Sequence, residues 1–198
     1  SRDIEITLEA NPDDLDQKFL KGVAEIGINR LSIGIQSFHD EDLRLMNRAH
    51  SSSQAESSVK RAQDAGIQNI SIDLIYGAPT SNFEIWKQNL DKAIALEVPH
   101  ISSYALTIEP RTVLENWITM VDFLKDNGFD HYEISNFGKP DFYSKHNTSY
   151  WKYKPYLGIG PSAHSYDGGQ IRAWNIANNS LYIKDLLQGK LPIEKEIL

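Results

Sequence analysis

The stretch Asn69-Ile-Ser-Ile-Asp-Leu-Ile-Tyr-Gly-Ala-Pro79 indicates a buried strand that ends on a carboxylate. Its isoleucines and leucine form a short apolar run, and Gly77 and Pro79 close the run, as is typical of a covered strand. Asp73 interrupts this run. A carboxylate in such a strand costs several kcal/mol unless a partner satisfies it. Asp73 therefore either bonds to neighbouring protein groups or binds a ligand.

Strand and helix patterns alternate along most of the chain. Strands are expected to begin near residues 4, 30, 70, 101 and 131. The expected helices are one capped by Asp14, then Asp40–Met46, a helix from the serine-rich turn 51–53 to Ala65, one capped by Ser81, one ending at Gly128, and Ser180–Gln188. This repeat predicts an α/β fold, with a partial (β/α) TIM-type barrel of parallel strands. A doubly wound open sheet is the alternative, but no Gly-x-Gly-x-x-Gly turn follows the first strand.

The pattern changes after residue 136. Residues 137–198 contain several prolines and glycines and a concentration of Tyr, Trp and His. We therefore predict a partial barrel over 1–136 and a loop-rich, aromatic extension over 137–198 packed on the barrel. Such an extension either covers a sheet edge or offers a surface to a flat apolar ligand.

Composition limits the possible functions of these 198 residues. They are 40% apolar and 24% charged, as in an ordinary globular domain, and their net charge of -7 argues against non-specific nucleic-acid binding. No apolar stretch approaches the roughly 20 residues of a membrane span, and the first residues do not resemble a signal peptide, which favours a cytoplasmic location. The chain contains no cysteine, which excludes disulfides, thiolate catalysis and Cys-bound metal within these residues.

Polar residues fall at the expected ends of four strands. They are Glu9, Gln36, Asp73 and Thr107. Because parallel barrel strands end at one mouth, we expect these side chains to converge. Two carboxylates and an amide suit a ligand with an amine and a ribose, and Arg48 is either a partner for a carboxylate of that ligand or a surface residue.

Two other kinds of site are not expected. No His-Glu-x-x-His or comparable spacing predicts a catalytic zinc ion. Ser162 lies in Gly160-Pro-Ser-Ala-His164, which lacks the Gly-x-Ser-x-Gly turn of a serine nucleophile.

Five ordered segments together resemble one family, the radical S-adenosylmethionine proteins that include oxygen-independent coproporphyrinogen III oxidase and a related bacterial haem chaperone. The segments are Ile6-Thr-Leu-Glu-Ala-Asn-Pro12, Asn29-Arg-Leu-Ser-Ile-Gly-Ile-Gln-Ser-Phe38, Ile72-Asp-Leu-Ile-Tyr-Gly-Ala-Pro79, Tyr132-Glu-Ile-Ser-Asn-Phe137 and His146-Asn-Thr-Ser-Tyr-Trp151. The last of these, with Gly158-Ile-Gly-Pro-Ser-Ala-His-Ser165, is more similar to the chaperone branch.

The resemblance implies a set of cofactors and contacts. The family's barrel holds a [4Fe-4S] cluster on three cysteines, and S-adenosylmethionine binds the open iron. Glu9, Gln36, Arg48 and Asp73 match the family's S-adenosylmethionine contacts, with Thr107 a further match, and Asp73 would accept hydrogen bonds from the ribose. His146, with Tyr150 and Trp151, is the implied haem contact.

The resemblance also implies a function in haem metabolism. The preferred function is a haem chaperone that works with an electron donor and a protein that accepts the haem. The alternative is an oxidase that decarboxylates coproporphyrinogen III to protoporphyrinogen IX.

One departure from the family is large. Its Cys-x-x-x-Cys-x-x-Cys motif and a Gly-Gly-Thr-Pro turn precede the first strand, and neither is present in these residues. The family also has a longer segment where Trp117 meets Ile118. We therefore expect that segments before Ser1 and near 117–118 are missing, and that these residues alone perform no radical chemistry.

Overall fold

The computed structural model describes residues 4–80, 82–106 and 110–197, with the backbone alone for 110–113. The chain divides into two compact units, Ser1–Tyr143 and Ser144–Leu198. The first unit extends past residue 136, where the sequence pattern changes, because the strand that begins there pairs within its sheet.

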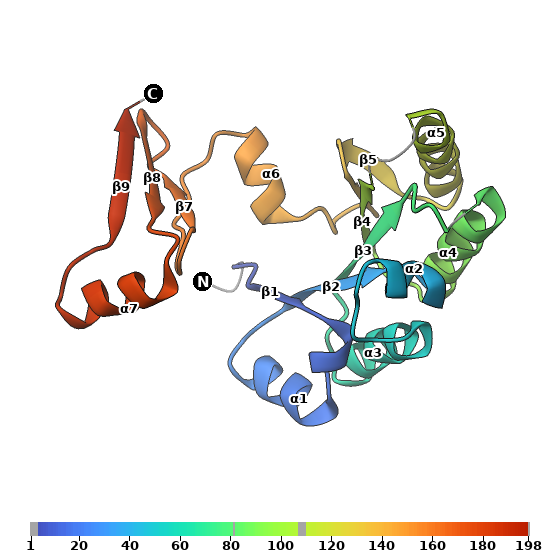
Figure 1. Cartoon of the computed structure of the whole chain (residues 1–198), viewed down its shortest axis with the longest axis horizontal. Coiled ribbons are helices and arrows are strands. Elements are labelled where there is room, and N and C mark those ends of the chain that lie inside the picture. Colours follow the sequence, from blue (N-terminus) through green and yellow to red (C-terminus); the bar gives the residue numbers. More distant parts are fainter. Residues whose placement is uncertain (1–3, 81, 107–109, 198) are drawn as a thin grey trace. The chain divides into compact units, whose positions relative to one another are not determined.

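The first unit is an α/β unit built on one six-stranded sheet (Figure 1). In chain order it contains β1 (Thr7–Ala10), a 3-10 turn (Pro12–Asp14), α1 (Gln17–Glu25), β2 (Arg30–Gln36), α2 (Asp40–Leu45), α3 (Ser52–Asp64), β3 (Ile70–Tyr76), α4 (Phe83–Ala95), β4 (His100–Ala105), α5 (Pro110–Asp126), β5 (Asp130–Glu133) and β6 (Asn136–Gly138). The strand order is β1-β2-β3-β4-β6-β5. Neighbours from β1 to β4 are parallel, which confirms the predicted partial barrel, and the sheet does not close.

The far edge of this sheet differs from the prediction. The strand expected over 131–134 is β5, and it forms an antiparallel hairpin with β6. It is β6 that pairs with β4, also antiparallel. A short turn of two residues joins β5 to β6, so the chain reverses before a crossover helix is possible.

The hydrophobic core lies between this sheet and its helices, and Figure 1 shows α3, α4 and α5 along one side of the strands. The sheet contributes alternate residues of each strand, because successive side chains of a strand point to opposite faces. The core includes Leu31, Ile33 and Ile35 of β2, Ile70, Ile72 and Leu74 of β3, Ile101 of β4, Phe137 of β6, and Leu20, Val59, Trp86, Leu90 and Leu124 of the helices.

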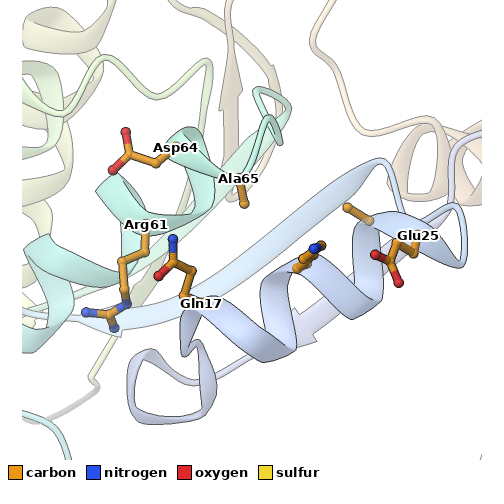
Figure 2. A pocket seen from close by; sticks show the side chains of 7 residues that line it. Gln17, Glu25, Arg61, Asp64 and Ala65 are labelled. Carbon is orange, nitrogen blue, oxygen red and sulfur yellow. The ribbon is translucent and has the colours of Figure 1, made fainter.

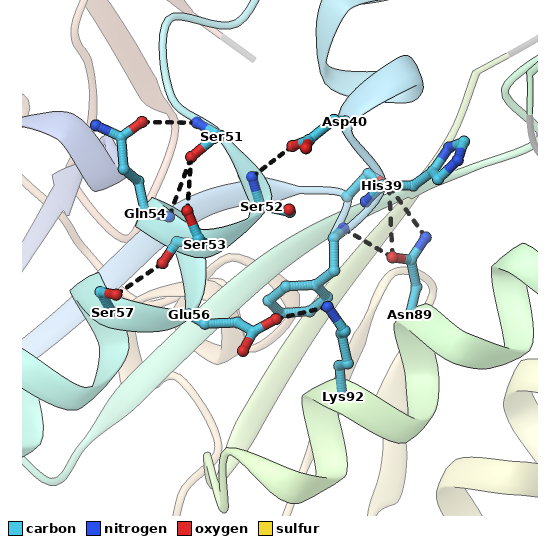
Figure 3. Close-up of polar contacts among 12 residues, drawn as sticks. His39, Asp40, Ser51, Ser52, Ser53, Gln54, Glu56, Ser57, Asn89 and Lys92 are labelled. Carbon is cyan, nitrogen blue, oxygen red and sulfur yellow. Dashed lines mark hydrogen bonds and ion pairs between the residues drawn. The ribbon is translucent and has the colours of Figure 1, made fainter.

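Side-chain caps fix where several helices begin. Ser51 and Gln54 form a reciprocal capping box at the start of α3, as expected for the turn at 51–53 (Figure 3). The N-cap of α1 is Asp16, whose carboxylate accepts from the N–H of Phe19, so the prediction of Asp14 was wrong by two residues. The N-cap of α4 is Asn82, and the predicted cap Ser81 lies outside the described residues. Helix α5 runs continuously through Trp117 and Ile118.

The second unit is smaller and less buried. It contains α6 (Lys145–Trp151), β7 (His164–Tyr166), β8 (Ile171–Asn175), α7 (Asn179–Leu187) and β9 (Ile193–Ile197). Its three strands form an antiparallel sheet in the order β7-β8-β9. Neither α6 nor α7 has a buried side chain. No helix in the described ranges combines the length and the apolarity that crossing a bilayer requires.

Candidate functional site

The sheet face opposite the helices is polar, and we call it the inner face. Its residues are the alternate positions that the core leaves out: Thr7, Glu9, Arg30, Ser32, Ser71, Asp73, His100, Ser102, Tyr132 and Asn136. The register places Ser32 beside Glu9 on one side and beside Ser71 on the other. It also places Asp73 beside Ser102, which lies beside Asn136.

Asp73 is a partly buried carboxyl in the middle of β3, rather than at the strand end where the sequence placed it. Ser32 donates to its Oδ1 at 3.3 Å from β2. Burial raises the pKa of Asp73 to about 6, and hydrogen bonding from Ser102 and Ser32 offsets only part of that shift. The nearby carboxylate of Glu9 raises the pKa further, whereas Arg30 lowers it. Asp73 thus has acceptor capacity that its protein neighbours leave incompletely used.

A hydrogen-bonded chain continues from Asp73's neighbours across the inner face. Ser71 Oγ lies 2.7 Å from His100 Nδ1, and His100 Nε2 lies 2.7 Å from the hydroxyl of Tyr132. Burial lowers the pKa of His100 to about 3, so its imidazole is neutral. Gly138 lies against these rings, because a Cβ there would be 2.9 Å from Tyr143 Cδ1 and 3.4 Å from the His100 and Tyr132 rings.

Gln36 ends β2 in a strained backbone turn. Its φ is 66°, and the N–H of Ser37 donates to the carbonyl of Ile35 at 2.8 Å, which makes Gln36 the centre of a three-residue γ-turn. His50 Nε2 lies 3.1 Å from the same carbonyl of Ile35. A non-glycine residue in this conformation costs about 1–3 kcal/mol and persists only where surrounding contacts hold it.

A buried network of polar side chains supports the turn at Gln36. Asn89 of α4 accepts from the N–H of Phe38 at 2.7 Å and donates to Ser37 Oγ at 3.1 Å (Figure 3). Ser37 in turn donates to Asp42 at 2.8 Å, and Asp42 also accepts from Thr80 at 2.5 Å. The network therefore ties the turn after β2 to α2, α4 and the loop after β3.

The Gln36 amide lies over Gly34 on the inner face. An ideal Cβ at Gly34 would be 2.8 Å from Gln36 Nε2 and 3.7 Å from Asn11 Oδ1. Arg48 Nη1 approaches the same Asn11 oxygen at 3.5 Å. Gly34 thus leaves space for the Gln36 amide beside Asn11, the residue that Arg48 approaches.

Arg30 is a buried cation on the inner face. It is 4% exposed, and its Nε finds no hydrogen-bond partner in the described ranges. Burial lowers its pKa from the ordinary value, while Glu5, Tyr132, Asp73 and Glu9 act in the opposite direction. Arg30 therefore supplies positive charge within an otherwise acidic surface.

The structure brings together four of the five residues that the resemblance assigned to S-adenosylmethionine, in two groups. Glu9 and Asp73 lie on the inner face on either side of Ser32. Gln36 and Asn11 both lie near Gly34, and Arg48 approaches Asn11. Thr107 lies outside the described residues. The sequence did not single out Asn11, Gly34, Ser32, Ser102 and Asn136, because short polar residues and glycine in a strand carry no periodic signal.

Two cavities lie away from the inner face. One of about 620 Å³ lies between α1 and α3, with charged side chains including Glu25, Arg61 and Asp64 around it (Figure 2). Arg61 is already used in structure, since its Nε donates to the carbonyl of Leu15 at 2.8 Å. A second cavity, of about 300 Å³, is lined by Arg48 and His50 near the start of α3. Neither contains Asp73.

Helix α6 of the second unit carries the three residues assigned to haem. His146 and Tyr150 are one turn apart, with 2.9 Å between Nε2 and the Tyr150 hydroxyl, and their rings meet edge to face. Trp151 is 59% exposed. Tyr150 also packs edge to face on Tyr156. An imidazole and two exposed aromatic rings thus lie on one short helix.

The residues of this chain fit the two implied cofactors differently. The carboxylates and amides are acceptors and Arg48 is a cation, which are groups that would suit S-adenosylmethionine. Thiolates for a [4Fe-4S] cluster do not occur among the 198 residues. In the described ranges, no three His, Asp or Glu side chains gather closely enough to hold a metal ion.

Comparisons with known proteins identify the family. Residues 1–93 match the model of the Radical SAM superfamily. The chain is 38% identical to "Heme chaperone HemW" of Lactococcus lactis, over 98% of this chain and 54% of that protein, and 39% identical to the protein of the same name from Haemophilus influenzae, with the same coverage. The chain spans about half the length of the curated relatives it matches.

A solved structure supports the same fold. Coproporphyrinogen III oxidase (HemN) from Escherichia coli superposes with a TM-score of 0.85 over all of this chain and 52% of its own, at 22% identity. The chain therefore belongs to the radical SAM superfamily, among the proteins related to HemN and HemW.

Proposed function

We propose that this chain forms the S-adenosylmethionine site and the haem-contacting helix of a haem chaperone. The observation that carries the first part is the partly buried carboxyl of Asp73, which faces the polar side of the sheet with Glu9 nearby. Asp73 would bind the ribose hydroxyls. Arg48, with Gln36 and Asn11 at the end of the sheet, would bind the amino-acid portion of the ligand.

The second part of the proposal concerns haem. Its support is the placement of His146, Tyr150 and Trp151 on α6, together with the similarity to proteins named haem chaperones. His146 would supply a nitrogen ligand to the iron, and the aromatic rings would contact the macrocycle. A protein that accepts the haem and an electron donor would complete the system. A [4Fe-4S] cluster would supply reducing electrons to S-adenosylmethionine when bound, on thiolates that these residues do not include.

Haem titration followed by absorption spectroscopy tests the haem site. His146→Ala is expected to weaken haem binding by about tenfold or more, as for loss of an axial or hydrogen-bonding partner. His164→Ala is the matched control, because His164 is also exposed and also contacts an aromatic ring of the second unit, that of Trp174. Unchanged titration of the His146 variant would remove this residue from the site.

An oxidase is the second candidate, favoured by the fold similarity to coproporphyrinogen III oxidase. Turnover of coproporphyrinogen III under anaerobic reduction, with the cluster reconstituted, distinguishes the two functions. Efficient conversion to protoporphyrinogen IX would overturn the chaperone proposal. Haem binding without conversion would support it.

A further inference from the structure

The hydroxyl of Ser102 has more acceptors near it than it has protons to donate. Its Oγ lies 2.6 Å from Asn136 Oδ1 and 3.3 Å from Ser71 Oγ. It also faces Asp73, its register partner on β3. A serine hydroxyl donates a single hydrogen bond, so Asn136 and Asp73 compete for one proton.

The geometry around Asn136 decides this competition. Its Nδ2 donates to the carboxylate of Glu133, so its Oδ1 is the atom that faces Ser102, and this oxygen can only accept. The separation of 2.6 Å is that of a strong O–H···O hydrogen bond. Ser71 has a second partner in His100 Nδ1, at 2.7 Å. The Ser102 proton is therefore committed to Asn136, and its contact with Asp73 is the weaker one.

We propose that Asn136 is a positioning residue, which withholds the Ser102 proton from Asp73 and so leaves that carboxylate free to accept both hydroxyls of a vicinal diol. The inference rests on the proposed function, in which the diol is the ribose of S-adenosylmethionine. A carboxylate that accepts from two neighbouring hydroxyls is the common way to bind a ribose. Each hydrogen bond from the protein to the same oxygens would compete with the ligand.

The other groups around Asp73 leave this role to Asn136. Glu9 faces Asp73 from β1 and Arg30 from β2. Tyr104 interacts electrostatically with Asp73 from β4 and also hydrogen-bonds with Ser102, while Glu133 acts on Tyr104. Ser32 donates to Oδ1 at 3.3 Å, a length that indicates a weak bond. Ser102 is thus the second hydroxyl beside Asp73, and Asn136 is the group that takes its proton.

A double-mutant cycle tests the proposal through the Kd of S-adenosylmethionine, measured calorimetrically. Asn136→Leu should weaken binding about tenfold, since Ser102 then turns to Asp73. Ser102→Ala alone should change the Kd by less than about threefold, and in the double variant most of the lost affinity should return. An equal loss from Asn136→Leu with and without Ser102 would overturn the proposal, as would no loss at all.

A measurement without ligand separates this inference from the proposed function. The Asp73 carboxyl, followed by 13C NMR across pH, should titrate at lower pH in Asn136→Leu, because a donated hydrogen bond favours the charged form. The change should vanish when Ser102 is alanine. If these midpoints respond and no variant binds S-adenosylmethionine, the ligand assignment fails and the positioning role stands; unresponsive midpoints overturn the positioning role. Asn136→Ala, which adds no volume, serves if the leucine variant does not fold.

Discussion

Asn89 Oδ1 accepts a hydrogen bond from the backbone N–H of Phe38 at 2.7 Å, and this bond joins helix α4 to the turn that presents Gln36. Asn89 is 2% exposed, so the N–H that it satisfies is shielded from water. We predict that Asn89→Leu destabilises the protein by about 1–3 kcal/mol, since it leaves buried donors unsatisfied. It should also weaken S-adenosylmethionine binding about tenfold, because Gln36 loses its imposed conformation. Urea unfolding and calorimetric titration measure the two effects.

Asn82→Ala is the matched control for Asn89. Asn82 caps the same helix through the N–H of Ile85 but does not contact the Gln36 turn. Its loss should cost about 1 kcal/mol of stability. The Kd for S-adenosylmethionine should stay unchanged. If the control weakens binding equally, general loosening of α4 and not the Asn89 contact explains the effect.

Gly34→Ala should separate ligand binding from stability. The added Cβ would lie 2.8 Å from Gln36 Nε2, and this atom is the end of a flexible side chain that can move. Stability should therefore change by less than about 1 kcal/mol, whereas the displaced amide should weaken S-adenosylmethionine binding. Thermal unfolding and calorimetry test the pair of outcomes. A large fall in stability would show that the backbone, not Gln36, resists the methyl group.

Gly22→Ala is the control for that substitution. Gly22 lies inside helix α1, and nothing lies within 4 Å of a Cβ built there. Alanine should stabilise the helix by about 0.5–1 kcal/mol without affecting the ligand.

Asp73→Asn should make the protein more stable at neutral pH. The folded pKa is about 6, above the ordinary 3.8, so stability falls as pH rises through this interval and stays low above it. Asparagine removes the cost of burying a charged carboxylate. We therefore expect the free energy of unfolding to rise by about 1–3 kcal/mol at pH 7.5, a gain that disappears below pH 4. Denaturant unfolding at the two pH values measures it, with the exposed Asp122→Asn as control. A variant that is less stable at pH 7.5 would contradict a desolvated carboxylate.

The sequence predicted much of the barrel because β2 and β3 carry regularly spaced isoleucine and leucine residues and strands alternate with capped helices. It predicted β5 but not its antiparallel pairing, because the hydrophobic pattern of 131–134 is the same for a parallel strand and for one arm of a hairpin. Pairing partners distinguish the two, and they are a property of the folded sheet.

The sequence singled out the charged residues of the candidate site but not its small polar residues. Asp73 stands out because a carboxylate in an apolar strand is costly, and Glu9 because it follows the alternating residues of the first strand. Ser32, Ser102 and Asn136 matter through cross-strand register, which brings residues 41 positions apart, such as Ser32 and Asp73, within hydrogen-bonding distance. Sequence spacing does not encode that register.

His100→Gln should reduce the loss of folding stability in acid, a loss that Asp73 partly offsets in the wild type. The folded pKa of His100, about 3, lies below the ordinary 6.5, so its contribution is complete above pH 6.5 and is lost as pH falls toward 3. Asp73 acts in the opposite direction between about 4 and 6, and the two slopes partly cancel in the wild type. The prediction is therefore sharpest in the Asp73→Asn background.

In that background, the free energy of unfolding of the protein with His100 should fall by roughly 2–3 kcal/mol between pH 6.5 and 4.5. That of the glutamine variant should fall much less. At pH 7.5 the glutamine should cost about 1–3 kcal/mol, because one side-chain amide cannot replace both the 2.7 Å contact to Ser71 and that to Tyr132. His164→Gln, an exposed position, should leave both values unchanged. Equal acid sensitivity with and without His100 would mean that other groups govern unfolding in acid.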